Sequence, residues 1–579
     1  MSSRLLLSLA AVAVAFAAAD TYVVVLALPD MMTTVGLSVD ELQRAAPIVS
    51  GFLLGYVAVL PLIGRIADLR GRVPVLVGSL LVFALGSLVT AAAYDLPSMV
   101  TGRFLQGVGG GGLVPATLAL VADLYPPARR GVPLGVVGAV QELGSVLGPL
   151  YGAVVLAVTE WQAIFAINLV VALVLAAALR AQPSPEHEPG RWDWTGAVLL
   201  ALALVAVVLT MVQPTRLTTD VTLGLAFVPV IGESRWLAPV GIAALVLSTA
   251  FLVRCLTARR PLVDVRGWAG VARDADLTGA ALLGLALAGI ILAFATADPE
   301  VAVFSPAGLW FLAGSAVAAV LLWLHTRRAA EPLVPRGAFA AVPAWGALVV
   351  SFFVGAALIA ALVDIPIFAR VTVYPTSQLA AALVLVRFLV ALPVGALVGG
   401  YLVRRVSAGT VTAAGMLLAA AGFVWMSTWG LTTLEHPVAT VPLVAAGLGF
   451  GVALAPVNAA LLAATDAAVH GVASALLVVA RMVGMLVGIS ALTTIGLRRY
   501  YAVQVDLPSP SEVCASGTQC AAYTRLLKEA GLAQLETVFV GAAVCALVAA
   551  VAALLTFRGA ATRDETVAAA PRESGTLRP

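Results

Sequence analysis

Sixteen long apolar segments constrain the fold of this 579-residue chain more than any other feature of its sequence. Each has roughly the 20 residues that an α-helix needs to cross the hydrocarbon core of a bilayer. Charged residues make up only 11% of the chain, against about 25% in soluble domains, so a soluble core has no room for this much apolar surface. The sequence therefore predicts an all-α polytopic membrane protein. The expected spans lie near residues 4–30, 45–64, 73–93, 97–121, 133–158, 162–180, 194–213, 236–256, 277–296, 307–325, 343–368, 377–402, 409–429, 440–463, 471–497 and 534–557.

The expected spans form three groups along the chain. Residues 1–180 are predicted to form a six-helix bundle, residues 181–336 a linker region with four extra spanning helices, and residues 337–557 a second six-helix bundle. Residues 558–579 are polar and mix Ala, Pro, Arg and Glu, which predicts a disordered tail.

The four linker spans are predicted to be a duplicated pair. Residues 193–200 read DWTGAVLL and residues 276–283 read DLTGAALL. A similar tail follows each pair, RPLV at residues 260–263 and EPLV at residues 331–334. Chance similarity between helices rich in Ala and Leu is the alternative, but the repeated tail favours duplication.

Arginine clusters occur in alternate loops, and this pattern predicts the orientation of the chain. Cytoplasmic loops carry an excess of Lys and Arg, so the even number of spans places both termini in the cytoplasm. Arg498 and Arg499 are the exception, because this topology places their loop outside. The arginine-rich loops are 65–72, 128–131, 254–273, 325–336 and 404–405.

The loop at residues 64–72, GRIADLRGR, is the most specific short pattern in the chain. Three arginines and one aspartate cannot lie in hydrocarbon, so the segment is a short turn at a membrane face. Gly64 and Gly71 permit a tight reversal, and Asp68 and Arg72 are the candidate gating residues of this loop.

Two further patterns fall inside expected spans. The first, RFLQG, begins at Arg103. The glycines in and after it match the spacing of a dinucleotide-binding fingerprint, but that motif follows a β-strand and none is expected here, so dinucleotide binding is rejected. GSVLGPLYG at residues 144–152 has small residues at regular spacing, which give a helix a smooth face, and a proline that bends it. A structural kink without directional meaning is the alternative. The candidate residues of the second pattern are Gly144, Gly148, Pro149 and Gly152.

Four charged residues are expected near the middle of the bilayer. They are Asp20, Glu142, Arg387 and Arg481. An unpaired charge at that depth costs at least ~2.5–3.5 kcal/mol. Two acids and two bases therefore suggest mutual pairing, with protons as the coupling ion.

The loop at residues 498–533 is long and is expected on the outer side of the membrane. It contains Cys514 and Cys520, and a disulfide is permitted outside the cytoplasm. Thiols that remain reduced are the alternative.

The patterns resemble those of a known family. Residues 64–72 resemble the loop between helices 2 and 3 of major facilitator superfamily transporters, and R-x-x-Q-G resembles the helix 4 motif of that superfamily. Residues 144–152 resemble the antiporter motif of its export members. Residues 20–25, 141–152 and 478–486 are similar to the mycobacterial triacylglyceride exporters of the drug:proton antiporter branch.

The resemblance implies two six-helix bundles that face each other across a cavity. It further implies that Glu142 pairs with Arg387 and Asp20 with Arg481, each pair crossing between the bundles, and that Arg103 is linked to proton movement. Static structural pairs are the alternative. Arg387 departs from the family, in which a tryptophan is expected, and four linker helices stand in place of two.

The expected function is proton-coupled export of an apolar, triacylglyceride-like lipid, with a periplasmic lipid-carrying lipoprotein as partner and the protein acting as a monomer. A multidrug:proton antiporter with amphipathic drug substrates is the alternative, and a non-transporting membrane sensor or scaffold is a third interpretation. An enzyme, a cofactor, a metal site and nucleic-acid binding are not expected, because no nucleotide loop or metal-ligand spacing occurs.

Overall fold

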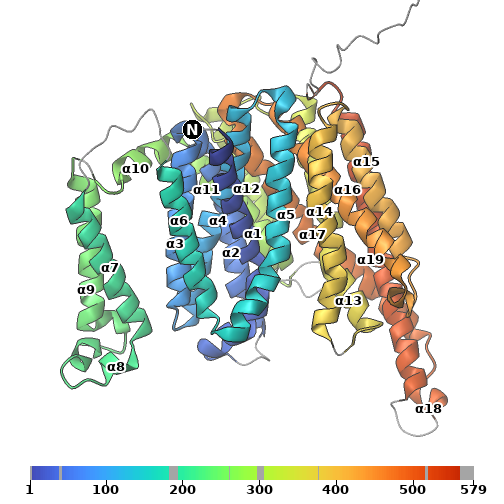
Figure 1. Ribbon diagram of the computed structural model, residues 1–579, viewed down its shortest axis with the longest axis horizontal. Helices are drawn as coiled ribbons and strands as arrows, with labels where there is room; N and C mark the ends of the chain where they lie inside the picture. Colours follow the sequence, from blue (N-terminus) through green and yellow to red (C-terminus); the bar gives the residue numbers. More distant parts are fainter. Residues whose placement is uncertain are drawn as a thin grey trace, which may run out of the picture.

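The computed structural model describes residues 3–37, 42–181, 193–259, 261–295, 305–375, 377–514, 520–560 and 562, and within these ranges it contains helices and no β-strand. Each of the sixteen expected spans overlaps a long helix (Figure 1), but α17 continues to Val505 and α19 begins at Ala521, so most of the loop expected at residues 498–533 is helical. Fifteen described helices are long and apolar enough, by length and composition, to cross a membrane. The remaining long helix is α5 (Gly131–Val158).

The N-terminal half is built from α1 (Ser3–Thr34), α2 (Leu42–Arg70), α3 (Arg72–Ala91), α4 (Leu96–Leu124), α5 and α6 (Gln162–Arg180). The linker contributes α7 (Trp194–Val212), α8 (Thr215–Thr218), α9 (Pro239–Thr257), α10 (Val265–Asp274), α11 (Leu277–Ala295) and α12 (Gly308–Arg328). The C-terminal half is built from α13 (Val342–Val371), α14 (Gln378–Leu402), α15 (Ala408–Met426), α16 (Thr440–Ala463), α17 (His470–Val505), α18 (Pro510–Val513) and α19 (Ala521–Thr556).

Local sequence explains where these helices begin and reverse. Gly71 alone separates α2 from α3, with φ of 93°, a conformation that favours glycine. Asp95 caps α4 by accepting a hydrogen bond from the Ser98 amide at 2.9 Å, and Pro97 occupies the first turn, where its missing N–H costs nothing.

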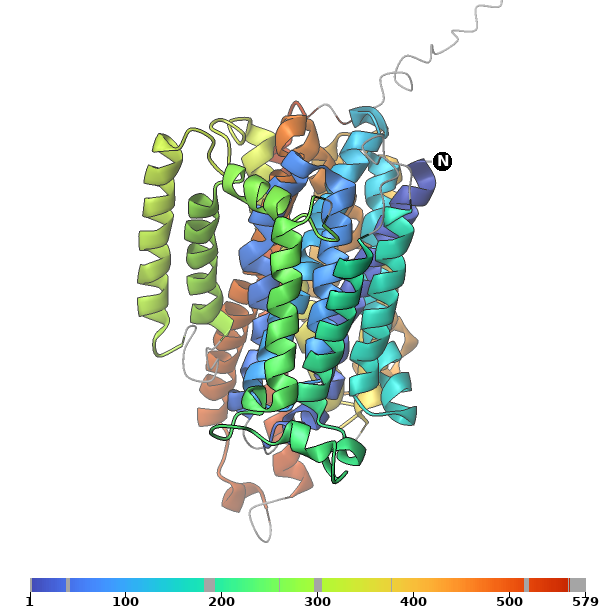
Figure 2. The ribbon, with the colours of Figure 1, turned by 90° about the vertical axis from the view of Figure 1, so that its left-hand side faces the viewer.

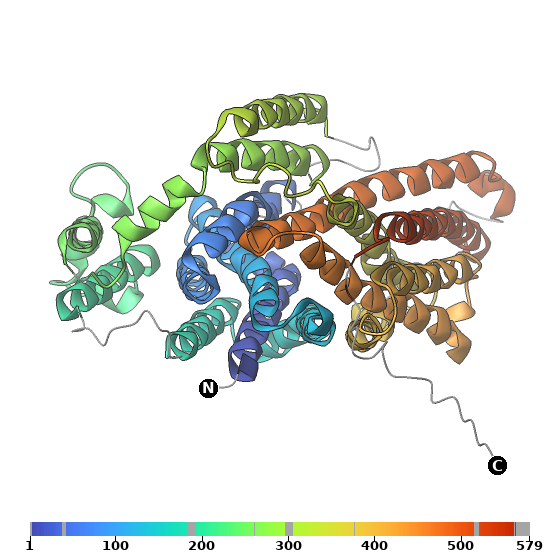
Figure 3. The ribbon, with the colours of Figure 1, turned by 90° about the horizontal axis from the view of Figure 1, so that it is seen from above.

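The two halves lie side by side and are joined by α5 against α14 and by α2 against α17 (Figure 3). We call the end of the bundle that carries residues 64–72 the motif end, and the end that carries Cys514 and Cys520 the disulfide end. The N-terminus lies at the motif end, whereas α18 lies at the disulfide end (Figure 1).

The linker helices form two hairpins in different places. The α11–α12 hairpin packs through α11 against α2 and α17, so it touches both halves. The α7–α9 hairpin stands beside the N-terminal half at the edge of the molecule (Figures 1 and 2). The short α10 connects the hairpins along the motif end, where Arg70 of α2 forms an ion pair with Asp264 at 3.0 Å.

The two hairpins are closed by the same arrangement of groups. Asp193 accepts hydrogen bonds from the Gly196 amide at 3.1 Å, from Arg254 at 2.9 Å and from the Leu262 amide. In the second hairpin, Asp276 contacts the Gly279 amide, His325 and the Leu333 amide at 2.9, 2.7 and 2.9 Å. In both hairpins the leucine follows the basic residue by eight positions.

We expect Asp193→Ala to open the first hairpin at its base. The hydrogen bond from Arg254, followed by that from the Gly196 amide, holds the pKa of Asp193 below its usual range. The stabilisation is therefore fully present above the unfolded pKa of about 3.9 and is lost only as the pH falls through the lower folded pKa. Hydrogen exchange, corrected for intrinsic rates, is expected to show protected Gly196 and Leu262 amides from pH 7 to pH 5, and roughly tenfold faster exchange in the variant. Asp220→Ala, in the loop of the same hairpin, is the control and should leave both amides protected.

Candidate functional site

A buried ion pair lies within the N-terminal half. Asp20 of α1 is 1% exposed and accepts a hydrogen bond from Nη1 of Arg103, on α4, at 2.9 Å. Nδ2 of Asn168, on α6, donates to the other carboxylate oxygen of Asp20. Three helices thus meet at one carboxylate, and the cation that compensates its charge comes from the same half.

The Arg103 side chain is held by polar and aromatic partners. Its Nη1 also donates to Oε1 of Gln106 at 2.8 Å, and Nε2 of Gln106 donates to Oγ of Ser87 at 2.9 Å. The guanidinium carbon lies 4.5 Å from the centre of the Phe52 ring, within the range of a cation–π interaction. We call Asp20, Arg103, Gln106 and Asn168 the Asp20 cluster.

The expected pairing of Asp20 with Arg481 is wrong for this structure. Because α1 packs against α4 inside the same bundle, Arg103 reaches Asp20 without crossing between the halves. Gln106 and Asn168 were not expected at the site. The R-x-x-Q-G pattern contained the first of them, and the second is a lone amide within the apolar segment 162–180.

A central cavity lies between the two halves. It comprises about 580 Å³ of space free of atoms, part of which is open to the surroundings, and is lined from both halves, mostly by apolar side chains. Glu142 of α5 and Arg481 of α17 face this cavity from opposite halves, and the positive charge of Arg481 acts on the Glu142 carboxyl. Its other lining residues are Val114, Leu118, Leu134, Val137, Gly138, Gln141, Ser351, Val354, Ala453, Leu454, Val457, Asn458, Leu477 and Val478.

The expected pairing of Glu142 with Arg387 is also wrong for this structure. Nη1 of Arg387 donates to Oγ1 of Thr440 at 3.0 Å, so the arginine is engaged by the first residue of α16 within its own half. Helix α5 does lie against α14, which carries Arg387, but the cation that shares the cavity with Glu142 is Arg481.

The glycines of α5 bring it into direct contact with α1. A Cβ atom added at Gly144 or Gly148 would lie 2.1 Å or 2.4 Å from the carbonyl oxygens of Ala15 or Ala19. At Gly152 it would lie 2.5 Å from the Val23 side chain. Small residues therefore permit the close approach of α5 to the helix that carries Asp20. The side chain of Pro149 lies outside the described residues.

The turn at residues 64–72 joins the two halves, and we call this contact the latch. The Asp68 carboxylate accepts hydrogen bonds from the Gly471 and Val472 amides, at the start of α17, at 2.8 and 3.0 Å. A carboxylate is favourable at a helix N-terminus because of the unpaired amides and the helix dipole. Arg72 binds Asp68 and also Asp123, the latter at 3.0 Å. We define the latch as Asp68, Arg72, Asp123 and the first turn of α17.

The halves are also in close contact on both sides of the latch. A Cβ atom at Gly64 would lie 2.6 Å from the Gly471 carbonyl oxygen, and one at Gly131 would lie 2.5 Å from that of Gly400. Nη1 of Arg130 donates to the Leu462 carbonyl at 3.2 Å. The hydrogen bonds from Arg72 to Ala467, from Arg130 to Leu462, and from the Gly471 and Val472 amides to Asp68 all join the halves at this motif end. The structure is therefore a state in which the halves are closed at the motif end.

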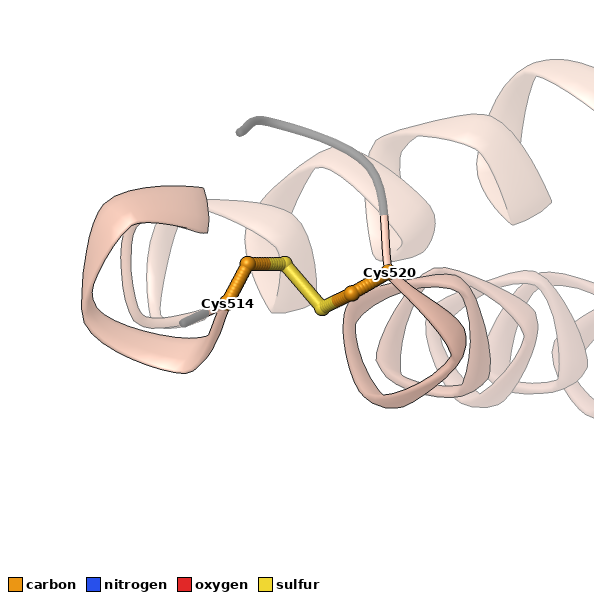
Figure 4. Close-up of a disulfide and its surroundings, with 2 residues drawn as sticks. All are labelled: Cys514 and Cys520. Atoms are coloured by element: carbon orange, nitrogen blue, oxygen red, sulfur yellow. A yellow bond between two sulfur atoms is a disulfide. The ribbon is translucent and has the colours of Figure 1, made fainter. Parts of the chain in front are cut away.

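At the opposite end, Cys514 and Cys520 form a disulfide between α18 and the start of α19 (Figure 4). This is the pair that the sequence singled out. Within the described residues, no group of three or more His, Cys, Asp or Glu side chains could hold a metal ion.

Comparisons with known proteins agree with this geometry. Residues 10–298 match the model of the Major Facilitator Superfamily. The chain is 36% identical over 547 residues to a triacylglyceride transporter of Mycolicibacterium hassiacum, covering 91% of this chain and 86% of that protein. It is 36% identical over 521 residues to a triacylglyceride transporter of Mycobacterium tuberculosis, covering 87% and 85%. A solved structure of the proton:xylose symporter XylE, bound to 6-bromo-6-deoxy-D-glucose, is 15% identical with a TM-score of 0.50, covering 93% of this chain and 94% of its own, which shows a shared fold.

Proposed function

Because this chain belongs to the major facilitator superfamily, we propose that it is a secondary transporter that exports an apolar, triacylglyceride-like lipid by alternating access. The observation that carries the proposal is the 36% identity, over most of both chains, to proteins named as triacylglyceride transporters. The mostly apolar lining of the central cavity supports a lipid as cargo. Export by alternating access moves the lipid without making or breaking a covalent bond in it.

Alternating access requires that the latch and the opposite end of the bundle open in turn. In the present state the latch joins the halves at the motif end. Release of Asp68 from the first turn of α17 would let this end open, while Gly64 and Gly471 separate. Gly71 and Arg72 hold the turn in the geometry that the latch needs.

We assign proton coupling to the Asp20 cluster. Protonation of Asp20 would remove its attraction to Arg103, and Gln106 and the Phe52 ring remain to hold the arginine. Since α5 contacts α1 through glycines beside Asp20, a shift of α1 would be passed to α5 and its Glu142. Arg387 has no role in this cycle, because it is bound within its own half.

The motif end is assigned to the cytoplasm and the disulfide end to the outer side of a bacterial inner membrane. The arginine-rich turn at residues 64–72 supports this orientation through the positive-inside rule. The Cys514–Cys520 disulfide supports it independently, because disulfides persist outside the cytoplasm.

The outer loop is the proposed contact for a periplasmic lipid-carrying lipoprotein. Helices α17 and α19 have 36 residues each, so each is about 54 Å long at 1.5 Å per residue against a hydrocarbon core of about 30 Å. Their excess length and α18 project beyond the other helices at the disulfide end (Figure 1). In a monomer, the projecting ends of α17 and α19 together with α18 would provide the surface on which the carrier docks to receive the lipid.

We further propose that the chain is organised as bundle, duplicated linker and bundle, with boundaries near residues 180 and 336. The Asp193 and Asp276 closures support duplication, because the same three kinds of group meet at each aspartate.

Reconstitution into proteoliposomes tests the transport proposal. Labelled triacylglyceride is expected to cross the membrane when a pH gradient is imposed, and to stop when the gradient is collapsed with an ionophore. Efflux of a cationic dye without lipid flux would instead favour the multidrug antiporter. The absence of both activities in folded protein would favour a sensor or scaffold.

Glu142→Gln is expected to reduce lipid flux at least tenfold. The substitution leaves Arg481 without the carboxylate that faces it across the cavity, so closure around the cavity must desolvate an uncompensated charge. Glu160→Gln, in the exposed turn after α5, is the matched control and should keep wild-type flux. If Glu142→Gln transports like the control, the charge pair has no role in the cycle.

A further inference from the structure

A second cavity separates the α7–α9 hairpin from the N-terminal half. It comprises about 550 Å³ of space free of atoms, part of which is open to the surroundings, and Ser248 is the one polar side chain among its described lining residues. Leu85, Leu88 and Val89 of α3, together with Ala92 directly after it, form one wall. The opposite wall comprises Leu200, Ala203, Leu204, Val207, Val208 and Met211 of α7 with Ser248 and Phe251 of α9. We call this cavity the hairpin groove.

The hairpin groove has the depth of one leaflet. Its lining on α7 runs from Leu200 to Met211, which is about 16 Å along a helix at 1.5 Å per residue, against roughly 15 Å for half of a 30 Å hydrocarbon core. The lining residues of α3, and all of those on α7 that follow Ala203, lie in the half of the helix nearer the disulfide end. The groove therefore fits acyl chains of the leaflet at that end.

A cation stands at the mouth of the groove. Arg235 donates from Nη1 to the carbonyl of Met211, a lining residue, at 2.8 Å, and its guanidinium carbon lies 4.2 Å from the centre of the Tyr94 ring. Trp236 donates from Nε1 to the Tyr94 hydroxyl at 3.2 Å. Tyr and Trp are typical of the membrane interface, so these three residues mark the level of the lipid headgroups.

Arg235 retains capacity for an anionic ligand. A guanidinium has five N–H donors, and in the described structure one hydrogen bond, to Met211, is made. The Tyr94 ring and the Met211 carbonyl fix its position, so little side-chain entropy remains to be lost on binding. Arginine is well suited to phosphate because its planar donors match two phosphate oxygens.

We propose that the hairpin groove binds one anionic phospholipid, with an acyl chain between α3 and α7 and its phosphate on Arg235. The site is separate from the central cavity, and its ligand is retained and not transported. A bound lipid would fill the space between the hairpin and the bundle, which are in contact where Arg235 and Trp236 meet Tyr94 and through α10. The lipid thereby fixes the hairpin against the N-terminal half.

Native mass spectrometry of the delipidated full-length protein tests this proposal, with phosphatidylglycerol as the probe and diacylglycerol, which lacks phosphate, as its neutral counterpart. One phosphatidylglycerol is expected to bind at least tenfold more tightly than diacylglycerol. Arg235→Ala should remove this preference, and Val207→Trp should block the groove and abolish the tight site. Arg216→Ala, an exposed arginine in α8 of the same hairpin, is the matched control and should bind as wild type.

Phosphatidylglycerol binding that is unchanged in Arg235→Ala would overturn the proposal, as would equal binding of diacylglycerol by the wild type. Competition by inorganic phosphate alone, at concentrations that leave the protein folded, would show an anion site without a lipid and would also overturn it. Since Arg235 is at the protein surface, its variant decides the question even if Val207→Trp fails to fold.

Discussion

Asp20→Asn is expected to abolish proton-driven lipid flux, lowering it at least a hundredfold in proteoliposomes. The carboxamide keeps the size of the side chain and can still accept from Asn168, but it can neither take up a proton nor balance Arg103. Leaving the arginine as an uncompensated buried charge costs about 3–5 kcal/mol. The midpoint of thermal unfolding should therefore fall together with the flux.

A second variant separates the proton role from stability. Asp20→Asn combined with Arg103→Gln removes both charges, so we expect thermal stability to recover while flux remains absent. Asp30→Asn, an exposed aspartate near the end of the same helix, is the control and should transport normally. If the double variant recovers proton-dependent flux along with its stability, Asp20 is a structural residue and the assignment of coupling to it is wrong.

Gly64→Val is expected to hold the two halves apart at the motif end and to stop transport. Even a Cβ atom at this position would lie 2.6 Å from the Gly471 carbonyl oxygen and 3.0 Å from the Ala475 side chain. The nearest obstacle is backbone, which cannot rotate away, so α17 must move and the Asp68 hydrogen bonds to its first turn must break. We expect flux to fall more than tenfold.

Spin labels at Arg129 and Thr410, which are exposed at the motif end of opposite halves, provide the structural measurement. Their distance distribution should shift to longer values in Gly64→Val. Gly314→Val is the matched control, because a Cβ atom at Gly314 in α12 meets no atom within 4 Å. An unchanged distance distribution in Gly64→Val would mean that the Gly64–Gly471 contact does not control closure.

The spans were predictable from sequence because each depends on local hydrophobicity alone. Chain length and apolar runs suffice to find α1 or α19, and the 64–72 pattern marks the turn between α2 and α3 from its charges and glycines. The repeated D-x-x-G pattern indicated from sequence that Asp193 and Asp276 occupy equivalent positions. In each hairpin this aspartate caps the helix that follows.

The charge pairing was not predictable in the same way, because it depends on which helices are neighbours and on how far each side chain is turned. Arg103 was not among the four charges expected near the middle of the bilayer, so the search for opposite charges at that depth paired Asp20 with Arg481. The structure decides for Arg103 because α1 and α4 are in contact. For Arg387, a nearby hydroxyl on Thr440 provides a polar partner that a search for opposite charges overlooks.

The two linker hairpins begin and end with the same hydrogen-bond arrangement, and this has a consequence for how the chain can gain or lose helices during evolution. Each hairpin starts at an aspartate that caps its first helix and ends at a leucine whose amide returns to that aspartate. A recombination event between the two D-x-x-G sites would excise one complete hairpin together with α10 and rebuild an intact cap at the junction. The helices downstream would keep their direction through the membrane, so the protein can lose or gain such a cassette without inverting its second bundle.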